Sequence, residues 1–124
     1  METLIVEETN ITPKVILDKE KGIFLLKGHS RPEDSVNFYQ PILNWIKAYA
    51  ANPNTTTVVT IALEYFNTSS SKMVYSLIGT FKEPFSKGFD IKVDWQYPAD
   101  DEDLLEMGQD YASIVPIPFI FTPL

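Results

Sequence analysis

The chain has 124 residues, of which 44% are hydrophobic, and a formal net charge of -7. This size and composition fit a single domain, residues 1–124, that buries a core without disulfides or a structural metal. The absence of cysteine excludes thiol nucleophiles and cysteine-based zinc sites, and the single histidine, His29, leaves little for a metal cluster or a Ser-His triad. The acidic excess disfavours binding to nucleic acid or anionic lipid, so protein partners are expected.

The N-terminal residues lack the features of a targeting segment. They contain no basic region followed by a long apolar core, as a secretion signal does. No apolar run approaches the ~20 residues that a membrane-spanning helix needs. We therefore expect a cytoplasmic protein without membrane insertion.

The first predicted element is a β-hairpin. Residues 15–18 and 23–26 are apolar runs, and the polar connection between them ends in Gly22, as a tight turn requires. A helix follows, with apolar residues at helical spacing and with Asp34 or Ser35 as its cap. These apolar residues are Val36, Tyr39, Leu43, Ile46 and Ala50. Because Pro41 lies inside this pattern, the helix is either kinked or begins near Pro41.

Residues 57–66 form the most continuous apolar and β-branched run, which predicts a central strand. A second amphipathic pattern over residues 73–81 predicts a helix that Pro84 terminates. Residues 91–97 then alternate strictly between apolar and polar side chains. This alternation predicts a strand with one buried and one solvent-exposed face, in a sheet that helices cover on one side only.

The acidic residues 100–103 begin a third predicted helix, because carboxylates favour the positive end of the helix dipole. A final short strand is expected at residues 118–121. The element order calls for a mixed sheet with helical crossovers. In such sheets the carboxyl ends of parallel strands lie on one edge, which would bring together the turns at residues 29–34, 67–71 and 98–103.

The turn after the central strand is crowded with hydroxyl groups, since Asn67 is followed by Thr68, Ser69, Ser70 and Ser71. The first backbone N–H groups of a helix lack internal partners and carry the positive end of its dipole. Hydroxyl residues at this place therefore either cap the helix or accept an anion. Taken alone, such a run is most often only a helix start.

The whole segment from Leu63 to Lys72 resembles the signature of the SiaC family of bacterial regulatory phosphoproteins. The resemblance covers nearly the whole chain, through residues 32–35, 41–45, 95–97, 100–103 and 118–119. It implies an α/β fold similar to STAS domains and anti-anti-sigma factors, a mixed β-sheet with about three helices packed mainly on one face.

The same resemblance implies a non-catalytic protein controlled by phosphorylation of Thr68. A cognate serine/threonine protein kinase would add the phosphate, a PP2C-like phosphatase would remove it, and the unmodified form would bind and activate a diguanylate cyclase in cyclic-di-GMP and biofilm signalling. No cofactor, metal or catalytic residue is expected. The residues expected to contact partners lie around Thr68 and in the first turn: Glu64, Asn67, Ser69, Ser70, Ser71, Lys72, Arg31, Glu33 and Asp34.

Two other functions remain open at this point. The helix N-terminus at Thr68 would also suit a module that binds a small anionic metabolite. A small hydrolase would use Thr68 or Ser69 as its nucleophile and His29 as its base, but the sequence specifies neither an orienting group nor an oxyanion site. The acidic residues 100–103 would suit a divalent cation, although a solvated helix start is the commoner role of such a run.

Overall fold

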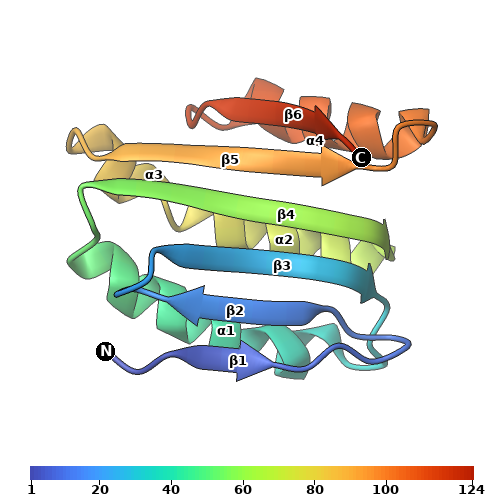
Figure 1. Ribbon diagram of the computed structural model, residues 1–124, viewed down its shortest axis with the longest axis horizontal. Coiled ribbons are helices and arrows are strands. Elements are labelled where there is room, and N and C mark those ends of the chain that lie inside the picture. The colour runs from blue at the N-terminus through green and yellow to red at the C-terminus, as the bar shows by residue number, and fades with distance from the viewer.

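The structure is a computed structural model that describes residues 1–124. Six strands form one sheet in which their spatial order is their order in the chain (Figure 1). They are β1 (Leu4–Val6), β2 (Lys14–Asp18), β3 (Ile23–Ser30), β4 (Thr56–Phe66), β5 (Asp90–Tyr97) and β6 (Phe119–Pro123). β2 is antiparallel to both of its neighbours, β1 and β3, whereas β3 to β6 are parallel to one another. The predicted mixed sheet is confirmed.

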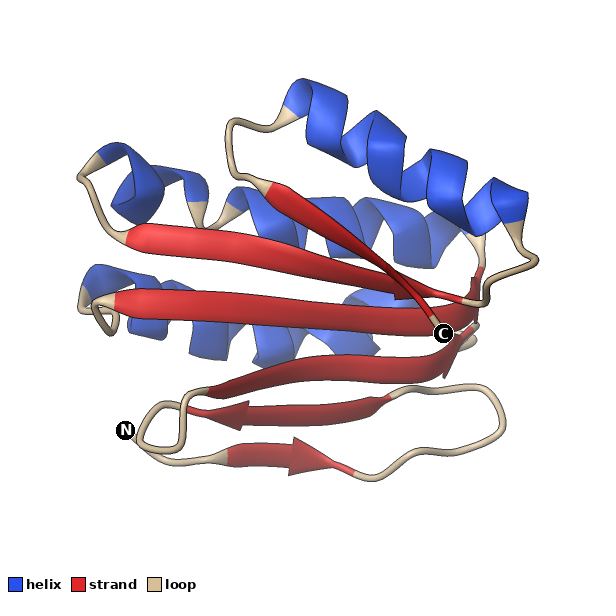
Figure 2. Ribbon diagram, turned by 45° about the horizontal axis from the view of Figure 1, so that its top comes forward, coloured by secondary structure: helices blue, strands red, loops and turns tan.

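Helices lie on only one face of this sheet (Figure 2). They are α1 (Ser35–Ala51), α2 (Thr68–Gly79), the short α3 (Lys82–Ser86) and α4 (Glu102–Ile114). Parallel strands need crossover connections, and here helices supply all three of them. The hairpin, the central strand and the three long helices are confirmed. Neither β1 nor α3 was predicted, because three and five residues are too short to show a period.

Both helix predictions that depended on proline need correction. α1 begins at Ser35 and runs through Pro41, so a helix start near Pro41 is wrong. The buried face of α1 also differs from the predicted one. Ile42 and Tyr49 are buried in place of their predicted neighbours Leu43 and Ala50, and Val36 is 57% exposed. α2 ends at Gly79, and Pro84 lies inside α3, where it is the third residue. The first N–H groups of a helix have no partner in that helix, so proline is tolerated there.

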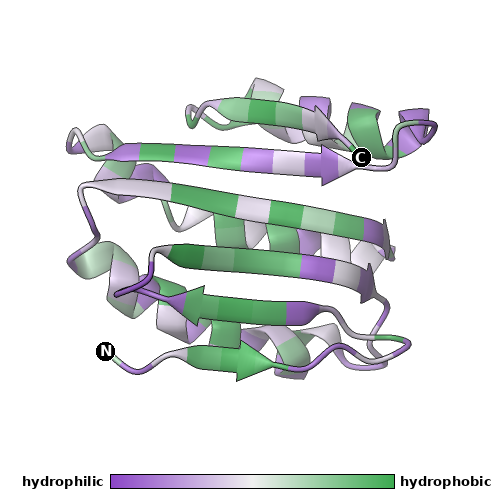
Figure 3. Ribbon diagram, in the orientation of Figure 1, coloured by the Kyte–Doolittle hydropathy of each residue, from purple (hydrophilic) through white to green (hydrophobic).

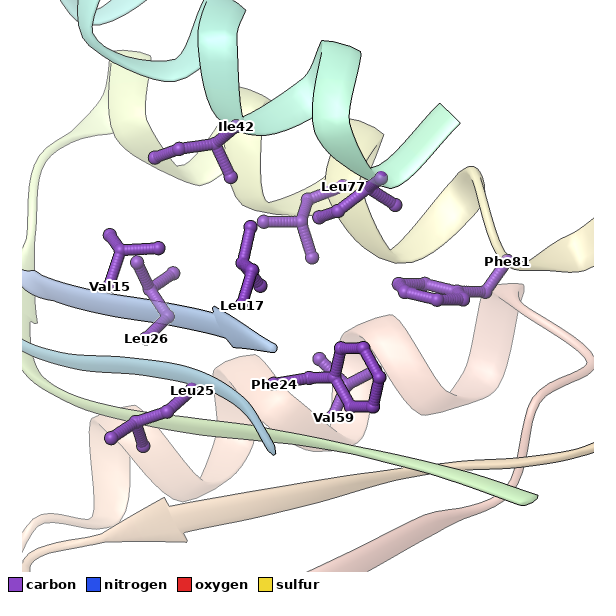
Figure 4. A pocket seen from close by; sticks show the side chains of 10 residues that line it. Val15, Leu17, Phe24, Leu25, Leu26, Ile42, Val59, Leu77 and Phe81 are labelled. Carbon is purple, nitrogen blue, oxygen red and sulfur yellow. The ribbon is translucent and has the colours of Figure 1, made fainter. Parts of the chain in front are cut away.

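The core lies between the sheet and α1 and α2. Side chains from β2, β3 and β4 meet Ile42 of α1, Leu77 of α2 and Phe81, which lies between α2 and α3 (Figure 4). The space left among them is only about 10 Å³ and is lined entirely by apolar residues. A cavity of this size offers a water molecule neither room nor polar partners. This part of the protein is therefore packed core and has no room for a ligand.

The opposite face of the sheet carries no helix (Figure 2). Along the strands, residues are mostly hydrophobic on β2 and alternate between hydrophilic and hydrophobic on β5 (Figure 3). On β5 the buried residues Ile91, Val93 and Trp95 alternate with less buried polar ones, as predicted. On β4, Val58 is 39% exposed while its neighbours Thr57 and Val59 are buried. The central strand therefore has one open face, although its sequence is apolar at both sets of positions.

α4 packs closely against β5 at Gly108. A Cβ atom at this position would lie 2.6 Å from Cδ1 and Nε1 of Trp95. Trp95 is 1% exposed, and its Nε1 donates a hydrogen bond of 3.0 Å to the Leu104 carbonyl, so the ring has little freedom to move. The absence of a side chain at residue 108 thus fixes how near α4 lies to the sheet.

We expect Gly108→Ala to destabilise the protein by about 1–2 kcal/mol. Overpacking costs about 1–3 kcal/mol, which exceeds the gain of up to about 1 kcal/mol from replacing glycine in a helix. Gly79→Ala is the matched control, because a Cβ there would meet only the end of Lys82 at 3.9 Å. It should stabilise the protein by about 0.5–1 kcal/mol. Urea unfolding followed by tryptophan fluorescence measures both, and equal signs for the two variants would contradict this packing.

Candidate functional site

The carboxyl ends of β3, β4 and β5 lie on the same edge of the sheet, and each is followed by a helix. The turn after β4 is joined to the end of β3, since Asn67 N–H donates a 3.0 Å hydrogen bond to the Ser30 carbonyl. The end of β4 also lines a groove together with Asp101 and Asp103 from the third turn. The expected juxtaposition of the three turns is confirmed.

Asn67 caps the helix that begins at Thr68. Its Oδ1 accepts hydrogen bonds from Ser70 N–H at 2.9 Å and from the Ser69 hydroxyl at 3.2 Å. An asparagine in this position satisfies one of the N–H groups that the first helical turn leaves without a partner. Because Asn67 serves as the cap, none of the following hydroxyl groups is needed for that purpose.

A buried chain of hydroxyl groups holds Ser70. Ser30 Oγ donates to Ser70 Oγ at 2.9 Å, so the Tyr39 hydroxyl donates to Ser30 in the 2.6 Å bond between them. Ser30, Ser70 and Tyr39 are each 0% exposed. Burial raises the pKa of Tyr39 to about 12, which keeps this donor protonated at neutral pH. Ser70 was expected to contact a partner, but its side chain lies inside the protein.

Two further contacts fix the first turn of α2 to neighbouring helices. The Ser69 and Ser35 hydroxyls form a 2.7 Å hydrogen bond, which joins α2 to the start of α1. From α4, the Tyr111 hydroxyl donates to the Ser71 carbonyl at 2.9 Å. Burial raises the pKa of Tyr111 to about 12 as well. The turn is thus bound to β3, α1 and α4 at once.

Thr68 differs from all three serines in this turn. Its side chain is exposed, and its hydroxyl makes no hydrogen bond within the protein. The Ser71 hydroxyl, by contrast, donates to the Thr68 carbonyl at 2.7 Å. Thr68 and Ser69 are both exposed, but among the four consecutive hydroxyl residues only Thr68 has a hydroxyl group without a hydrogen-bond partner in the protein.

The charged residues predicted around Thr68 occupy different places. Glu64 faces His29, with 3.5 Å between Oε2 and Nδ1. Arg31 lies against the N-terminal segment, where its backbone N–H donates to the Ile11 carbonyl at 2.8 Å. Lys72 is exposed and forms no ion pair. The turn therefore contains no cluster of cations around Thr68.

In the turn between β3 and α1, Asp34 caps α1. Its two carboxylate oxygens accept hydrogen bonds from the backbone N–H of Asn37 at 3.2 Å and from the Asn37 side-chain amide at 2.7 Å. The capping role predicted for Asp34 or Ser35 thus belongs to Asp34, whereas Ser35 bonds to Ser69. Glu33 is exposed beside it. Asp34 is held by helix α1, and Glu33 is the freer of the two carboxylates.

The geometry offers little support for a hydrolase. His29 is paired with Glu64, while Ser69 is bonded to Ser35 and Asn67, so no base contacts either candidate nucleophile. No group of three or more histidine or carboxylate side chains is arranged to hold a metal. None of the helices has the length and apolar character needed to cross a membrane.

Several residues that shape this site were not identified as such from the sequence. Ser30, Tyr39 and Tyr111 come from three different elements, and their contacts with α2 depend on tertiary packing. Ser35 was considered only as a helix cap. No local pattern marks a hydroxyl group whose partner lies 34 or 40 residues away in the chain.

Comparison with known proteins supports a single family. The model of the SiaC family regulatory phosphoproteins matches residues 6–124. An uncharacterised protein of Pseudomonas aeruginosa strain UCBPP-PA14 is 24% identical over 119 residues, which cover 96% of this chain and 94% of that protein.

Two solved structures have the same fold. The crystal structure of apo-SiaC from Pseudomonas aeruginosa matches with a TM-score of 0.89 at 24% identity, over 98% of this chain and 99% of that one. A chain in the crystal structure of the diguanylate cyclase SiaD in complex with its activator SiaC, from the same species, matches with a TM-score of 0.91 at 23% identity and the same coverage. The matched family model, which spans all but the first five residues, shows that this chain belongs to the SiaC family of regulatory phosphoproteins.

Proposed function

We propose that this protein is a non-catalytic cytoplasmic switch, reversibly phosphorylated at Thr68, whose unmodified form binds and activates a diguanylate cyclase. Membership of a family of regulatory phosphoproteins supports the class of function. The activator role follows the matched structure of SiaD with its activator SiaC. The observation that carries the choice of residue is the exposed Thr68 hydroxyl, which has no hydrogen-bond partner in the protein.

The surroundings of the other hydroxyl groups favour Thr68 as the acceptor. A kinase must reach the oxygen that attacks the γ-phosphate of ATP and position it in line. Ser70 is fully buried, and the Ser69 hydroxyl is bonded to both Ser35 and Asn67. The Ser71 hydroxyl is bonded to a backbone carbonyl one turn back. Transfer to any of these serines would first break internal contacts, whereas transfer to Thr68 breaks none.

The switch would act through charge at the protein surface. A phosphate on Thr68 adds a charge of about -1.5 to -2 at the N-terminus of α2, where the helix dipole stabilises it. Glu64, Asp101 and Asp103 on the adjacent edge disfavour it, and no arginine cluster is present to draw it inward. The phosphate is therefore expected to stay in solvent and to leave the fold unchanged.

The partners proposed for this surface are a cognate serine/threonine kinase, a PP2C-like phosphatase and the cyclase. All predicted contact residues except the buried Ser70 are exposed or partly exposed, namely Arg31, Glu33, Asp34, Glu64, Asn67, Ser69, Ser71 and Lys72. The rigid capping of α2 supports this use, because a fixed backbone presents the same surface to each partner without a cost in ordering.

Thr68→Ala should abolish labelling by the cognate kinase while keeping the fold. Because the Thr68 side chain neither caps the helix nor forms a hydrogen bond, its loss should change the free energy of unfolding by no more than about 0.5 kcal/mol. Ser69→Ala is the matched control, with one hydroxyl removed from the same turn, and it should be labelled to full stoichiometry. The measurement is phosphate incorporation by intact mass, with urea unfolding of each variant. Full labelling of Thr68→Ala would assign the acceptor to a neighbouring serine.

A further inference from the structure

Ser30, the last residue of β3, holds the start of α2 at two points. Its carbonyl accepts the Asn67 backbone N–H at 3.0 Å, and its hydroxyl donates to Ser70 Oγ at 2.9 Å. Asn67 is the cap of α2 and Ser70 is its third residue, so the two bonds enclose Thr68 between them. The backbone at Thr68 is therefore fixed relative to the sheet by a residue of a different strand.

Tyr39 of α1 supports Ser30 in this role. Its hydroxyl donates to Ser30 Oγ at 2.6 Å, and Ser30 donates onward to Ser70. A hydrogen bond accepted by Ser30 limits the rotation of its hydroxyl and strengthens the bond that it donates. All three side chains are 0% exposed, so solvent does not compete for these bonds. The position of the first turn of α2 thus depends on a hydroxyl group of α1.

Stability alone is a weak reason for such a chain of hydroxyls. A buried hydrogen bond between neutral groups contributes little net free energy, and apolar side chains of the same shape can do as well. A fully bonded polar network instead restricts the surrounding core to one arrangement. This network is bonded to the turn that carries the proposed phosphate acceptor, where a single arrangement of the backbone has a use.

That use follows from the chemistry of phosphate transfer. The Thr68 oxygen attacks the γ-phosphorus of ATP, the bond to the bridging oxygen breaks and ADP leaves, while the hydroxyl proton passes to a base of the kinase. The rate of such a transfer depends mainly on how well the attacking oxygen is placed in line. Because the Thr68 hydroxyl has no hydrogen bond in the protein, only the backbone that carries it sets its position.

We propose that Tyr39 and Ser30 are positioning residues for the phosphorylation of Thr68. Acting through Ser70, they hold the first turn of α2 so that the Thr68 oxygen already stands in one place when the kinase binds. This inference rests on the proposed function, because it assigns two further residues to the same modification. Both lie inside the protein, so they act on the reaction without touching the kinase.

The test compares Tyr39→Phe with Tyr49→Phe, a matched control on the same helix. Tyr49 is also 0% exposed, and its hydroxyl bonds to Thr57 of β4 at 2.7 Å, at the opposite end of α1. Each variant loses one buried hydroxyl, so the midpoints of urea unfolding should fall by similar amounts. The kinase is the one from the same organism that labels the wild-type protein.

Tyr39→Phe should lower kcat for labelling of Thr68 at least about fivefold and leave KM within about twofold. The surface that the kinase contacts is unchanged, and only the placement of the oxygen is lost. Tyr49→Phe should leave both constants within about twofold. Ser30→Ala breaks the same chain with a smaller change in volume and should lower kcat in the same way.

Two further measurements separate positioning from a general loss of stability. In a Ser70→Ala background, Tyr39→Phe should cause no further loss of kcat, because the chain acts through Ser70. The amides of Ser70 and Ser71, which bond to Asn67, should exchange with deuterium at least about threefold faster in Tyr39→Phe and at the wild-type rate in Tyr49→Phe.

Wild-type kinetics in Tyr39→Phe and Ser30→Ala, or equal losses of kcat in Tyr39→Phe and Tyr49→Phe, would overturn the positioning role and leave Thr68 as the acceptor. A further loss in the Ser70→Ala background would overturn it as well. A wild-type protein that no kinase of its organism labels at Thr68 would instead contradict the proposed function, and this inference would fail with it.

Discussion

Phosphorylation of Thr68 is expected to lower the affinity for the cyclase partner by a few hundredfold. If the unmodified turn packs into the partner, a poorly compensated phosphate buried there costs about 3–5 kcal/mol, which corresponds to at least a hundredfold in the dissociation constant. Of the basic side chains expected near this turn, Arg31 lies against residues 10–11 and His29 faces Glu64. Lys72 follows Thr68 by four residues on α2, so this single lysine offsets only part of the phosphate charge.

Calorimetric titration of the partner with unmodified and phosphorylated protein measures this difference. Thr68→Val is the control that separates the loss of a hydroxyl from the gain of charge, and it should bind within about threefold of the unmodified protein. Amide chemical shifts of the two forms should differ only near residues 64–72 and the two neighbouring turns. Equal affinity of the two forms, or shift changes throughout the sheet, would contradict a switch that acts through local charge.

Ser70→Asp is expected to destabilise the protein by at least about 3 kcal/mol, because it places a carboxylate at a fully buried position. The only side-chain hydrogen bond to Ser70 Oγ comes from Ser30. One bond does not compensate the removal of a charge from water. Such a loss is a large fraction of the roughly 5–15 kcal/mol that a domain of this kind has available.

Two controls isolate the effect of charge in this experiment. Ser70→Asn has nearly the same shape as Ser70→Asp without the charge, so it reports the cost of the added volume alone. Thr68→Asp adds the same charge two residues earlier, where the side chain is exposed and the helix dipole favours it, and should change stability by no more than about 0.5 kcal/mol. The midpoint of urea unfolding orders the three variants. Equal effects at Thr68 and Ser70 would show that the turn is less rigid than the hydrogen bonds indicate.

The elements that the sequence predicted are those whose side-chain period is visible over many residues. Strict alternation in residues 91–97 and the long apolar run at 57–66 identified β5 and β4, because each pattern reports directly which side chains face the core. The prediction from Pro84 was wrong because it depended on one residue and not on a pattern over many. A single proline was taken to end a helix, but at the third residue of a new helix it removes no hydrogen bond.

The site was only partly predictable. The strand order placed the three turns on one edge, and the run of hydroxyls drew attention to the turn in which Thr68 is exposed. The sequence alone could not tell Thr68 from Ser70, because the difference in exposure arises when Ser30 and Tyr39 close over Ser70 from β3 and α1.

The most direct test of the central claim is the intact mass of the protein recovered from the organism that encodes it, followed by peptide mapping. We expect two species that differ by about 80 Da, the mass added by one phosphate, with the modification located at Thr68 and removed by treatment with a PP2C-type phosphatase. A phosphate found on Ser69, Ser70 or Ser71 with Thr68 unmodified would contradict it, and so would a protein that stays unphosphorylated in both free-living and biofilm cells.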